Sequence, residues 1–278
     1  MKSLQAFAQY KRDGRKIAMV TCYDAWSARI IAASHVDCIL VGDSAAMVVH
    51  GHDTTLPATT EMIAMHIAAV RSGAPHAFVI GDFPFLAQRQ GIPHAVATAE
   101  VLMRAGAQAV KIEGVRGHED VIRALVEAGV PVMGHLGLTP QSVHGLGGYK
   151  LQARTARAAR QLVDDARRVE ALGAFALVLE VVPAEVADDV TAALEIPTIG
   201  IGAGRHTSGQ VLVLQDLLGF ETRFHPRFVR RYMDGSRLIQ DALDRYAADV
   251  RGEHFPNDEE SHHVDARAID YDLAHASR

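Results

Sequence analysis

The stretches Ala77-Phe78-Val79-Ile80-Gly81 and Ala109-Val110-Lys111-Ile112, with the segment between them, show how this chain is organised. Each is a short run rich in apolar residues, of the kind that forms a buried strand. Between them, His94–Arg104 places apolar residues three or four positions apart beside charged ones, which is typical of an amphipathic helix. A strand, a helix and a second strand in this order predict a βαβ unit with parallel strands.

The same alternation continues in both directions along the chain. Eight runs favour a closed (β/α)8 TIM barrel over a doubly wound open sheet, which needs fewer strands and usually carries a glycine fingerprint after its first strand. The first run instead leads into Thr21-Cys22-Tyr23-Asp24. The expected strands are Lys16–Tyr23, Cys38–Gly42, Ala77–Gly81, Ala109–Ile112, Pro131–Gly134, Phe175–Leu179, Pro197–Ile201 and, less clearly, Val211–Leu214; the expected helices are Glu61–Val70, His94–Arg104, Glu119–Glu127, Thr155–Leu172 and Ala184–Leu194.

A chain of 278 residues is long enough for one such barrel. We expect a single catalytic barrel domain over residues 1–252, with a short N-terminal helix over residues 2–13 and a long terminal helix over Pro226–Arg251. From Gly252 onward the composition becomes polar and rich in histidine. We therefore expect the tail 253–278 to be disordered or to become ordered only against a neighbour.

Charge and hydropathy exclude several classes of partner. The chain has 28 Lys and Arg against 33 Asp and Glu, a net charge of −5, so no overall basic field attracts nucleic acid or an anionic membrane. It also lacks a signal-peptide pattern and any run near the ~20 apolar residues that cross a bilayer. We expect a cytoplasmic protein in which Cys22 and Cys38 are buried thiols.

Polar side chains follow the expected strands where each strand ends. In a TIM barrel the carboxyl ends of the strands meet at one mouth, which holds the active site. The sequence therefore predicts that four carboxylates, a lysine and an imidazole converge there, together with one serine. These residues are Asp43, Ser44, Asp82, Lys111, Glu113, His135 and Glu180.

Several carboxylates in one buried mouth repel each other strongly unless a cation or a proton intervenes. Oxygen ligands without a cluster of Cys and His favour Mg²⁺, which keeps water ligands and leaves positions for substrate oxygens. The alternative is that some of these acids are merely salt-bridged loop residues.

Lys111 and Glu113 lie two positions apart on one strand, so both side chains point to the same side of it. Lys111 is placed to neutralise a substrate carboxylate or enolate, or to act as a base or Schiff-base nucleophile. Glu113 is placed to bind the metal directly or through water. The alternative is an ion pair of Lys111 with Glu113 or Asp82 that supports the barrel.

His50-Gly51-His52-Asp53 resembles the paired-histidine motif of zinc-dependent barrel hydrolases. Those enzymes carry the pair on the first strand, however, whereas this pair follows the second. Zinc hydrolysis is therefore the less favoured alternative, and a role in ordering the loop is the preferred interpretation of His52 and Asp53.

At these positions the chain closely resembles the ketopantoate hydroxymethyltransferase family. The matching segments occur in order over about residues 15–250, and Ala153 stands where the family pattern has glycine. The segments are Met19–Asp24, Leu40–Ser44, Gly51–Pro57, Gly81–Phe85, Val110–Gly114, Gly134–Ser142, Gly147–Gln152, Leu177–Pro183 and Ile199–Gly204.

This resemblance implies a (β/α)8 barrel that uses Mg²⁺ and 5,10-methylenetetrahydrofolate to convert 3-methyl-2-oxobutanoate into 2-dehydropantoate, for pantothenate and coenzyme A synthesis. It also implies a homo-oligomer, typically a decamer. By the family's motifs Asp43, Asp82 and Glu113 hold the metal, and Glu180 is the proton acceptor. Asp43, Ser44, Asp82 and Lys111 contact the oxo acid.

The expected chemistry is enolisation of an oxo acid chelated to Mg²⁺, with Glu180 removing the C3 hydrogen. For His135 we expect a hydrogen bond to the oxo acid or to the folate, or else a supporting role in the core. The residues alone are also compatible with a Mg²⁺-dependent aldol-type lyase for another 2-oxo acid, and with an inactive barrel that serves binding or assembly.

Overall fold

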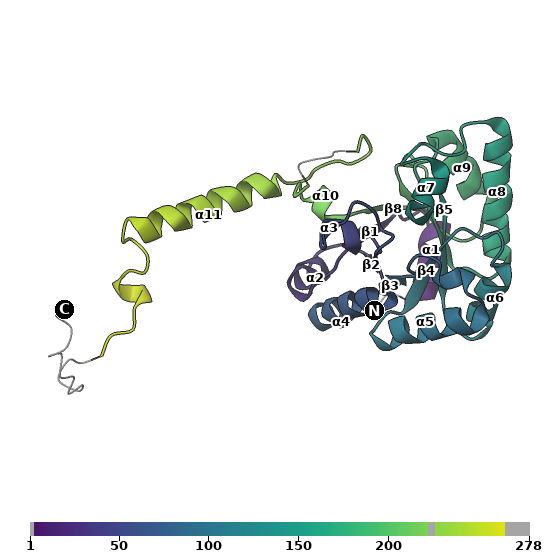
Figure 1. Ribbon diagram of the computed structural model, residues 1–278. Helices are drawn as coiled ribbons and strands as arrows, with labels where there is room; N and C mark the ends of the chain where they lie inside the picture. Colours follow the sequence, from purple (N-terminus) through teal and green to yellow (C-terminus); the bar gives the residue numbers. More distant parts are fainter. Residues whose placement is uncertain (1–2, 222–225, 265–278) are drawn as a thin grey trace. The chain divides into compact units, whose positions relative to one another are not determined.

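The computed structural model describes residues 3–221 and 226–264, and the unit Met1–Tyr232 is built around a closed barrel of eight parallel strands (Figure 1). The strands follow one another around the barrel, and β1 pairs with β8 to close it. The (β/α)8 prediction is confirmed, and closure excludes the open sheet. The strands are β1 Ile17–Thr21, β2 Cys38–Val41, β3 Val79–Asp82, β4 Ala109–Glu113, β5 Val132–Gly137, β6 Ala176–Glu180, β7 Thr198–Ile201 and β8 Gly209–Leu212.

Helices cover the outside of the barrel, and the crossover helices coincide with the expected ones to within three residues at each end. Capping side chains set where several of them begin, because a side-chain oxygen accepts a backbone N–H of the first turn. Thr59 accepts from Met62 at 3.2 Å, and Thr155 accepts from Ala158 at 3.2 Å. The longer helices of the barrel are α1 Leu4–Arg12, α2 Ala25–Ala32, α4 Thr60–Gly73, α5 Ile92–Arg104, α6 Glu119–Glu127, α8 Ala156–Ala171 and α9 Ala184–Ala193.

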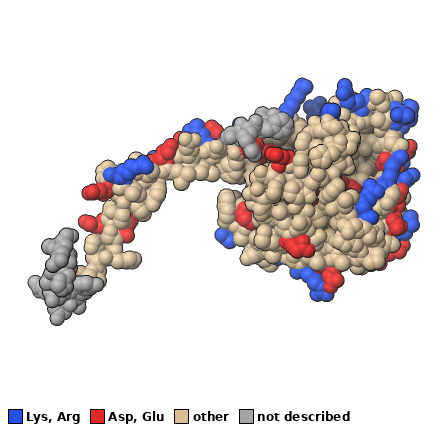
Figure 2. Space-filling view, in the orientation of Figure 1, with Lys and Arg blue, Asp and Glu red and all other residues tan. Residues whose placement is uncertain are grey.

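Short helical turns interrupt the loops at the mouth and in the C-terminal region. They are α3 Ala45–Val48, η1 Ala87–Arg89, η2 Pro140–Ser142, α7 Val143–Leu146, α10 Leu214–Leu217 and η3 Asp258–Glu260. Figure 2 shows acidic and basic side chains interspersed along the edge of the barrel where α8 lies.

In the barrel, β8 and α2 are two elements that differ from the sequence prediction for a clear physical reason. Strand β8 begins two residues earlier than the expected Val211–Leu214, because Gly209 pairs with Ile17 where the barrel closes, and Leu214 instead starts α10. Helix α2 is absent from the expected helices. It starts after Asp24, whose carboxylate accepts the Ser27 N–H at 2.8 Å.

The apolar core has two layers. The first lies between the strands and the surrounding helices, and strands β2, β3 and β4 are buried throughout, as expected where helices cover a parallel sheet. The second fills the barrel interior with side chains such as Ile17, Met19, Leu40, Ile80 and Met133. The barrel interior is therefore a packed core that supports the mouth.

Helix α1 extends this interior core with one aromatic side chain. Phe7 is 2% exposed, and its ring lies 5.1 Å from that of Phe78 and 5.6 Å from that of Phe175. These residues immediately precede strands β3 and β6. The expected N-terminal helix is thus confirmed, and it packs at the amino-terminal ends of the strands, opposite the mouth.

The chain divides into two compact units, Met1–Tyr232 and Met233–Arg278. The second contains α11 Gly235–Arg251, which is shorter at its start than the expected helix over Pro226–Arg251. The division into a catalytic domain 1–252 and a tail 253–278 stays a prediction, and positions 265–278 of that tail lie outside the described residues. Among the described helices, none has the length and apolar character needed to cross a membrane.

Replacing Phe7 by Ala should lower the free energy of unfolding by about 3–5 kcal/mol, because it leaves a cavity between Phe78 and Phe175. Urea denaturation measures this change. The matched control is Phe85→Ala, since Phe85 is 41% exposed and its loss should cost less than about 1 kcal/mol. Equal losses in the two variants would contradict the packing role of Phe7.

Candidate active site

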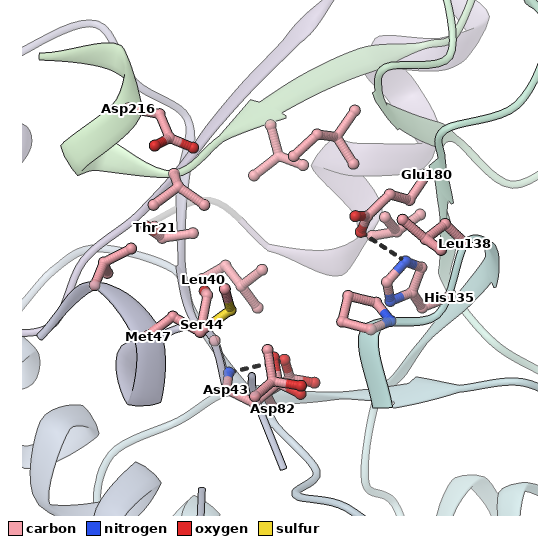
Figure 3. Close-up of a pocket in the computed structure, with 18 of the residues that line it drawn as sticks. Thr21, Leu40, Asp43, Ser44, Met47, Asp82, His135, Leu138, Glu180 and Asp216 are labelled. Atoms are coloured by element: carbon pink, nitrogen blue, oxygen red, sulfur yellow. Dashed lines mark hydrogen bonds and ion pairs between the residues drawn. The ribbon is translucent and has the colours of Figure 1, made fainter. Parts of the chain in front are cut away.

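The polar residues expected at the strand ends come together at the carboxyl-terminal mouth of the barrel (Figure 3). Asp82 ends β3, Lys111 and Glu113 lie on β4, His135 lies on β5 and Glu180 ends β6. Asp43 and Ser44 follow β2, and the seven side chains line one cavity of about 590 Å³. The expected convergence is confirmed as geometry, whereas the role of each residue stays a prediction.

Asp43 and Asp82 face each other across neighbouring strands. The backbone N–H of Asp43 donates to Oδ2 of Asp82 at 3.1 Å, and the residues are 4% and 1% exposed (Figure 3). Burial, followed by repulsion from Asp82 and Glu113, raises the pKa of Asp43 well above its ordinary value of 3.8. Burial also raises the pKa of Asp82, although the Lys111 charge opposes it.

Lys111 provides a positive charge to this group. Its Nζ lies 2.8 Å from Oδ1 of Asp82 and 4.0 Å from Oε1 of Glu113, so both of the ion pairs considered from the sequence exist. Burial acts to lower the pKa of Lys111, but the charges of Asp82, Glu113 and Asp43 outweigh it and raise the pKa. Lys111 therefore stays protonated, which disfavours the roles of base and Schiff-base nucleophile.

His135 lies between two carboxylates. Its Nδ1 is 3.4 Å from Oε1 of Glu113 and 3.2 Å from Nζ of Lys111, and its Nε2 is 3.2 Å from Oε2 of Glu180. Burial and the charge of Lys111 act to lower the pKa of His135, but the contacts with Glu113 and Glu180 raise it to about 9. The raised pKa favours a cationic ring at neutral pH, in ion-pair contact with both carboxylates.

Glu113 has one backbone donor and two ion-pair contacts. Burial acts to raise its pKa, but His135, Lys111 and the backbone N–H of Gln141 outweigh burial and lower it. The Gln141 N–H donates to Oε2 of Glu113 at 3.1 Å. Glu113 is thus an anion in this site, whereas the raised pKa values of Asp43 and Asp82 show that their charges lack sufficient compensation.

A hard divalent cation fits these carboxylates. Within the described residues, Oδ1 of Asp82 and Oε1 of Glu113 are buried and accept no hydrogen bond, and they face Lys111 and His135 by ion-pair contacts alone. In residues 3–221 and 226–264, no three Asp, Glu, His or Cys side chains form a ready-made metal site. Mg²⁺ commonly uses one or two carboxylates and keeps water as its other ligands, so the donor set suits it.

Two buried residues of this site are missing from the set expected at the strand ends. Gln141, in η2, donates from Nε2 to Oδ2 of Asp43 at 2.9 Å. The hydroxyl of Tyr23 lies 2.7 Å from Oγ of Ser44 and fixes that hydroxyl. Both residues lie within the segments that carry the family resemblance, and this position is the sequence feature from which they could have been predicted.

Strained backbone lies next to Glu180. Val181 has φ of +47°, a left-handed conformation that is unfavourable for a β-branched residue. Its carbonyl accepts the Gln152 N–H at 2.9 Å, and the next residue, Ala153, has φ of +52°. This positive φ is the physical reason why glycine suits position 153, where the family pattern has it.

The two loop histidines do not act as a pair. Nε2 of His50 lies 2.9 Å from Nε2 of His66, a buried residue of α4, whereas His52 lines the cavity with Asp53. This separation gives the zinc-hydrolase interpretation no support. The second ring nitrogen of His66 lies 2.7 Å from the carbonyl oxygen of Tyr23, which ties this loop to the end of β1.

Comparison with known sequences gives consistent matches. Residues 1–258 match the profile of ketopantoate hydroxymethyltransferase. A 3-methyl-2-oxobutanoate hydroxymethyltransferase of Coxiella burnetii (strain CbuG_Q212) is 52% identical over 252 residues, which cover 90% of this chain and 95% of that protein. One of the same name from Bdellovibrio bacteriovorus is 51% identical over 262 residues, covering 94% of this chain and 100% of that protein.

Solved structures share the fold at low sequence identity. A 2,3-dimethylmalate lyase, described as a PEP mutase/isocitrate lyase superfamily member, has a TM-score of 0.59 and 18% identity, over 90% of this chain and 89% of that chain. A phosphonopyruvate hydrolase in complex with oxalate and Mg²⁺ has a TM-score of 0.60 and 12% identity, over 94% and 93%. These similarities concern the barrel architecture alone.

Replacing Asp43 by Asn should stabilise the metal-free protein, because it removes a carboxyl group whose ionisation is unfavourable in the folded state. We expect a higher free energy of unfolding than that of the wild type at neutral pH. The folded state holds the Asp43 proton more tightly than the unfolded state does, so the advantage should be absent below about pH 4 and grow as the pH rises through the raised pKa.

Urea denaturation in EDTA between pH 4 and pH 8 measures this effect. The matched control is Asp188→Asn on the exposed surface of α9, which should show no such trend. A destabilised Asp43→Asn protein at neutral pH would show that the folded structure favours the Asp43 charge.

Proposed function

The chain belongs to the ketopantoate hydroxymethyltransferase family, and from this membership we propose how its residues carry out the reaction. The enzyme forms ketopantoate from 3-methyl-2-oxobutanoate by hydroxymethyl transfer, a step of pantothenate biosynthesis. The proposal adds that Mg²⁺ is required, that 5,10-methylenetetrahydrofolate supplies the one-carbon unit, and that the residues at the mouth have separate roles. One observation carries it: carboxylates from β2, β3, β4 and β6 gather around Lys111 and His135 in a single cavity.

Asp43, Asp82 and Glu113 would hold the cation in this proposal. The backbone N–H of Asp43 donates a hydrogen bond to Oδ2 of Asp82. Oδ1 of Asp82 and Oε1 of Glu113 accept no hydrogen bond from the described residues, and a hard cation would satisfy them. When bound, the metal acts as a Lewis acid toward the carboxylate and keto oxygens of the oxo acid, which acidifies the C3 hydrogen. The solved phosphonopyruvate hydrolase with oxalate and Mg²⁺ has the same barrel architecture.

Lys111 and Ser44 orient the oxo acid. Lys111 remains protonated and buried, so its ammonium compensates negative charge that develops on the substrate. The Ser44 hydroxyl shares a hydrogen bond of 2.7 Å with the hydroxyl of the buried Tyr23, and this contact fixes its position. Together with Asp43 and Asp82, these residues form the proposed oxo-acid site.

Glu180 removes the proton from C3. It ends β6 at the edge of the cavity, with its side chain 17% exposed, and Nε2 of His135 holds Oε2 at 3.2 Å. The other carboxylate oxygen carries the abstracted proton. His135 thus keeps Glu180 oriented toward the oxo acid. The resulting carbanion forms the new carbon–carbon bond to the one-carbon unit, whose two carbon–nitrogen bonds to the folate break. Water supplies the hydroxyl oxygen, Glu180 returns its proton to that oxygen, and tetrahydrofolate leaves.

The folate ring is proposed to bind against the apolar part of the cavity. About 590 Å³ is far more than a small branched oxo acid occupies, and such a volume is typical of drug-sized ligands. Val181, Ile201, Val213 and Phe228 line this part, beyond the ends of β6, β7 and β8. Phe228 approaches Gly202 so closely that a Cβ there would lie 2.9 Å from its ring, which places the aromatic side chain at the end of β7, the strand that pairs with β6.

The location and assembly of the enzyme are also part of the proposal. A cytoplasmic homo-oligomer, a decamer by resemblance, is expected from the family. In the C-terminal unit, Ile239, Leu243, Tyr246 and Val250 recur at helical spacing on α11 and are exposed, as apolar residues at subunit contacts are before assembly.

Replacing Glu180 by Gln should lower deuterium exchange at C3 of 3-methyl-2-oxobutanoate at least 100-fold, because the amide cannot accept the proton. Proton NMR in D₂O with Mg²⁺ measures the exchange. Binding of Mg²⁺ and of the oxo acid should stay within about threefold of wild type. Glu185→Gln, on the exposed start of α9, is the control, and normal exchange by Glu180→Gln would remove Glu180 from this role.

Replacing Phe228 by Ala should raise the KM for 5,10-methylenetetrahydrofolate at least about fivefold, because the variant loses aromatic contact area with the folate ring. Folate-independent deuterium exchange into the oxo acid should not change. Steady-state kinetics and the exchange assay separate the two effects. Trp26→Ala is the control because Trp26 is exposed on α2, away from the cavity, and an unchanged folate KM in Phe228→Ala would place the folate elsewhere.

A further inference from the structure

Gln141 joins three parts of the active site. It lies in η2, just after β5, and is 6% exposed. Its Nε2 donates to Oδ2 of Asp43 at 2.9 Å and to the carbonyl oxygen of Phe83 at 2.7 Å, while its backbone N–H donates to Oε2 of Glu113 at 3.1 Å. A single residue from the loop after β5 thus contacts the ends of β2, β3 and β4.

The orientation of the Gln141 amide follows from its partners. A carboxylate oxygen and a carbonyl oxygen both require a donor, so the NH₂ group has to face Asp43 and Phe83. The amide oxygen consequently points away from these two acceptors. Within the described part of the chain, this Oε1 is buried and accepts no hydrogen bond.

An acceptor in this state is unfavourable unless a water or another donor satisfies it, because the atom has lost its contacts with solvent. The side chain keeps this state because its NH₂ group is held by Asp43 and Phe83. The three hydrogen bonds of Gln141 thus agree on one role, which is to place the two carboxylates.

We propose that Gln141 is a positioning residue that presets Asp43 and Glu113 for a divalent cation. The inference rests on the metal role proposed for these two carboxylates. The side chain acts on Asp43, and the backbone acts on Glu113, so a substitution removes the first contact and leaves the second. A residue that merely packed the loop would affect folding without affecting the affinity for the cation.

The test measures the affinity of the whole protein for Mn²⁺, a probe for the divalent cation, in the absence of substrate. Gln141→Met keeps the volume of the side chain and removes both the donor and the acceptor. We expect it to weaken Mn²⁺ binding about tenfold or more, in the range typical of residues that orient metal ligands. Electron paramagnetic resonance of free Mn²⁺ gives the affinity, and competition with Mg²⁺ gives the affinity for Mg²⁺.

The matched control is Gln88→Met. Gln88 is another buried glutamine, 5% exposed, and its Nε2 approaches the backbone oxygen of Glu113 at 3.4 Å without contacting a carboxylate. The Gln88→Met protein should bind Mn²⁺ with the same affinity as the wild type. Gln141→Asn is the second variant if Gln141→Met unfolds, because the shorter amide stays polar in the same space yet cannot reach both Asp43 and Phe83, and it should lose affinity similarly.

The outcomes distinguish this inference from the proposed function. A wild-type protein that binds no Mn²⁺ would overturn the metal role of the carboxylates and the Gln141 inference with it. If the wild type binds Mn²⁺ and a folded Gln141 variant binds it with equal affinity, only the role of Gln141 would be overturned. Saturating Mg²⁺ should restore deuterium exchange in the variant to within about threefold of wild type, and a failure to recover would show a general distortion in place of weakened cation binding.

Discussion

The site depends on an electrostatic constraint: several buried carboxylates line the same cavity around one lysine. Asp43, Asp82 and Glu113 are each at most 4% exposed, and Lys111 is the lysine that lies among them. The raised pKa values of Asp43 and Asp82 show that one ammonium does not compensate three carboxylates. The protein therefore keeps an arrangement that is electrostatically unfavourable by itself and that the proposed cation would relieve, which is the usual conflict between stability and activity.

The barrel makes this arrangement possible because it leaves the charged groups little freedom. Parallel register places Lys111 beside Asp82 and Glu113 beside His135. Buried strands and the packed interior hold these positions from below, and an outer layer of helices holds them from the side. Side chains on such rigid strands keep their spacing when charges repel, whereas side chains on mobile loops would separate.

Loops then complete the geometry that the strands begin. Gln141 brings the segment after β5 against Asp43, and Gln152 contacts the strained Val181 beside Glu180. Backbone strain of this kind costs on the order of 1–3 kcal/mol and persists only where the surroundings enforce it. The segment between β5 and α8 therefore contacts both Asp43 and the backbone next to Glu180.

The sequence by itself determined the order of strands and helices and the residues that meet at the mouth. Periodicity is a local property, and in a parallel barrel the residues that end the strands must share one face, so Asp43, Asp82, Glu113 and Glu180 followed from position alone. The tertiary structure decided the rest. The start of β8 depends on its pairing with Ile17, and the contact between Gln141 and Asp43 joins residues 98 positions apart through a loop whose path no local pattern specifies.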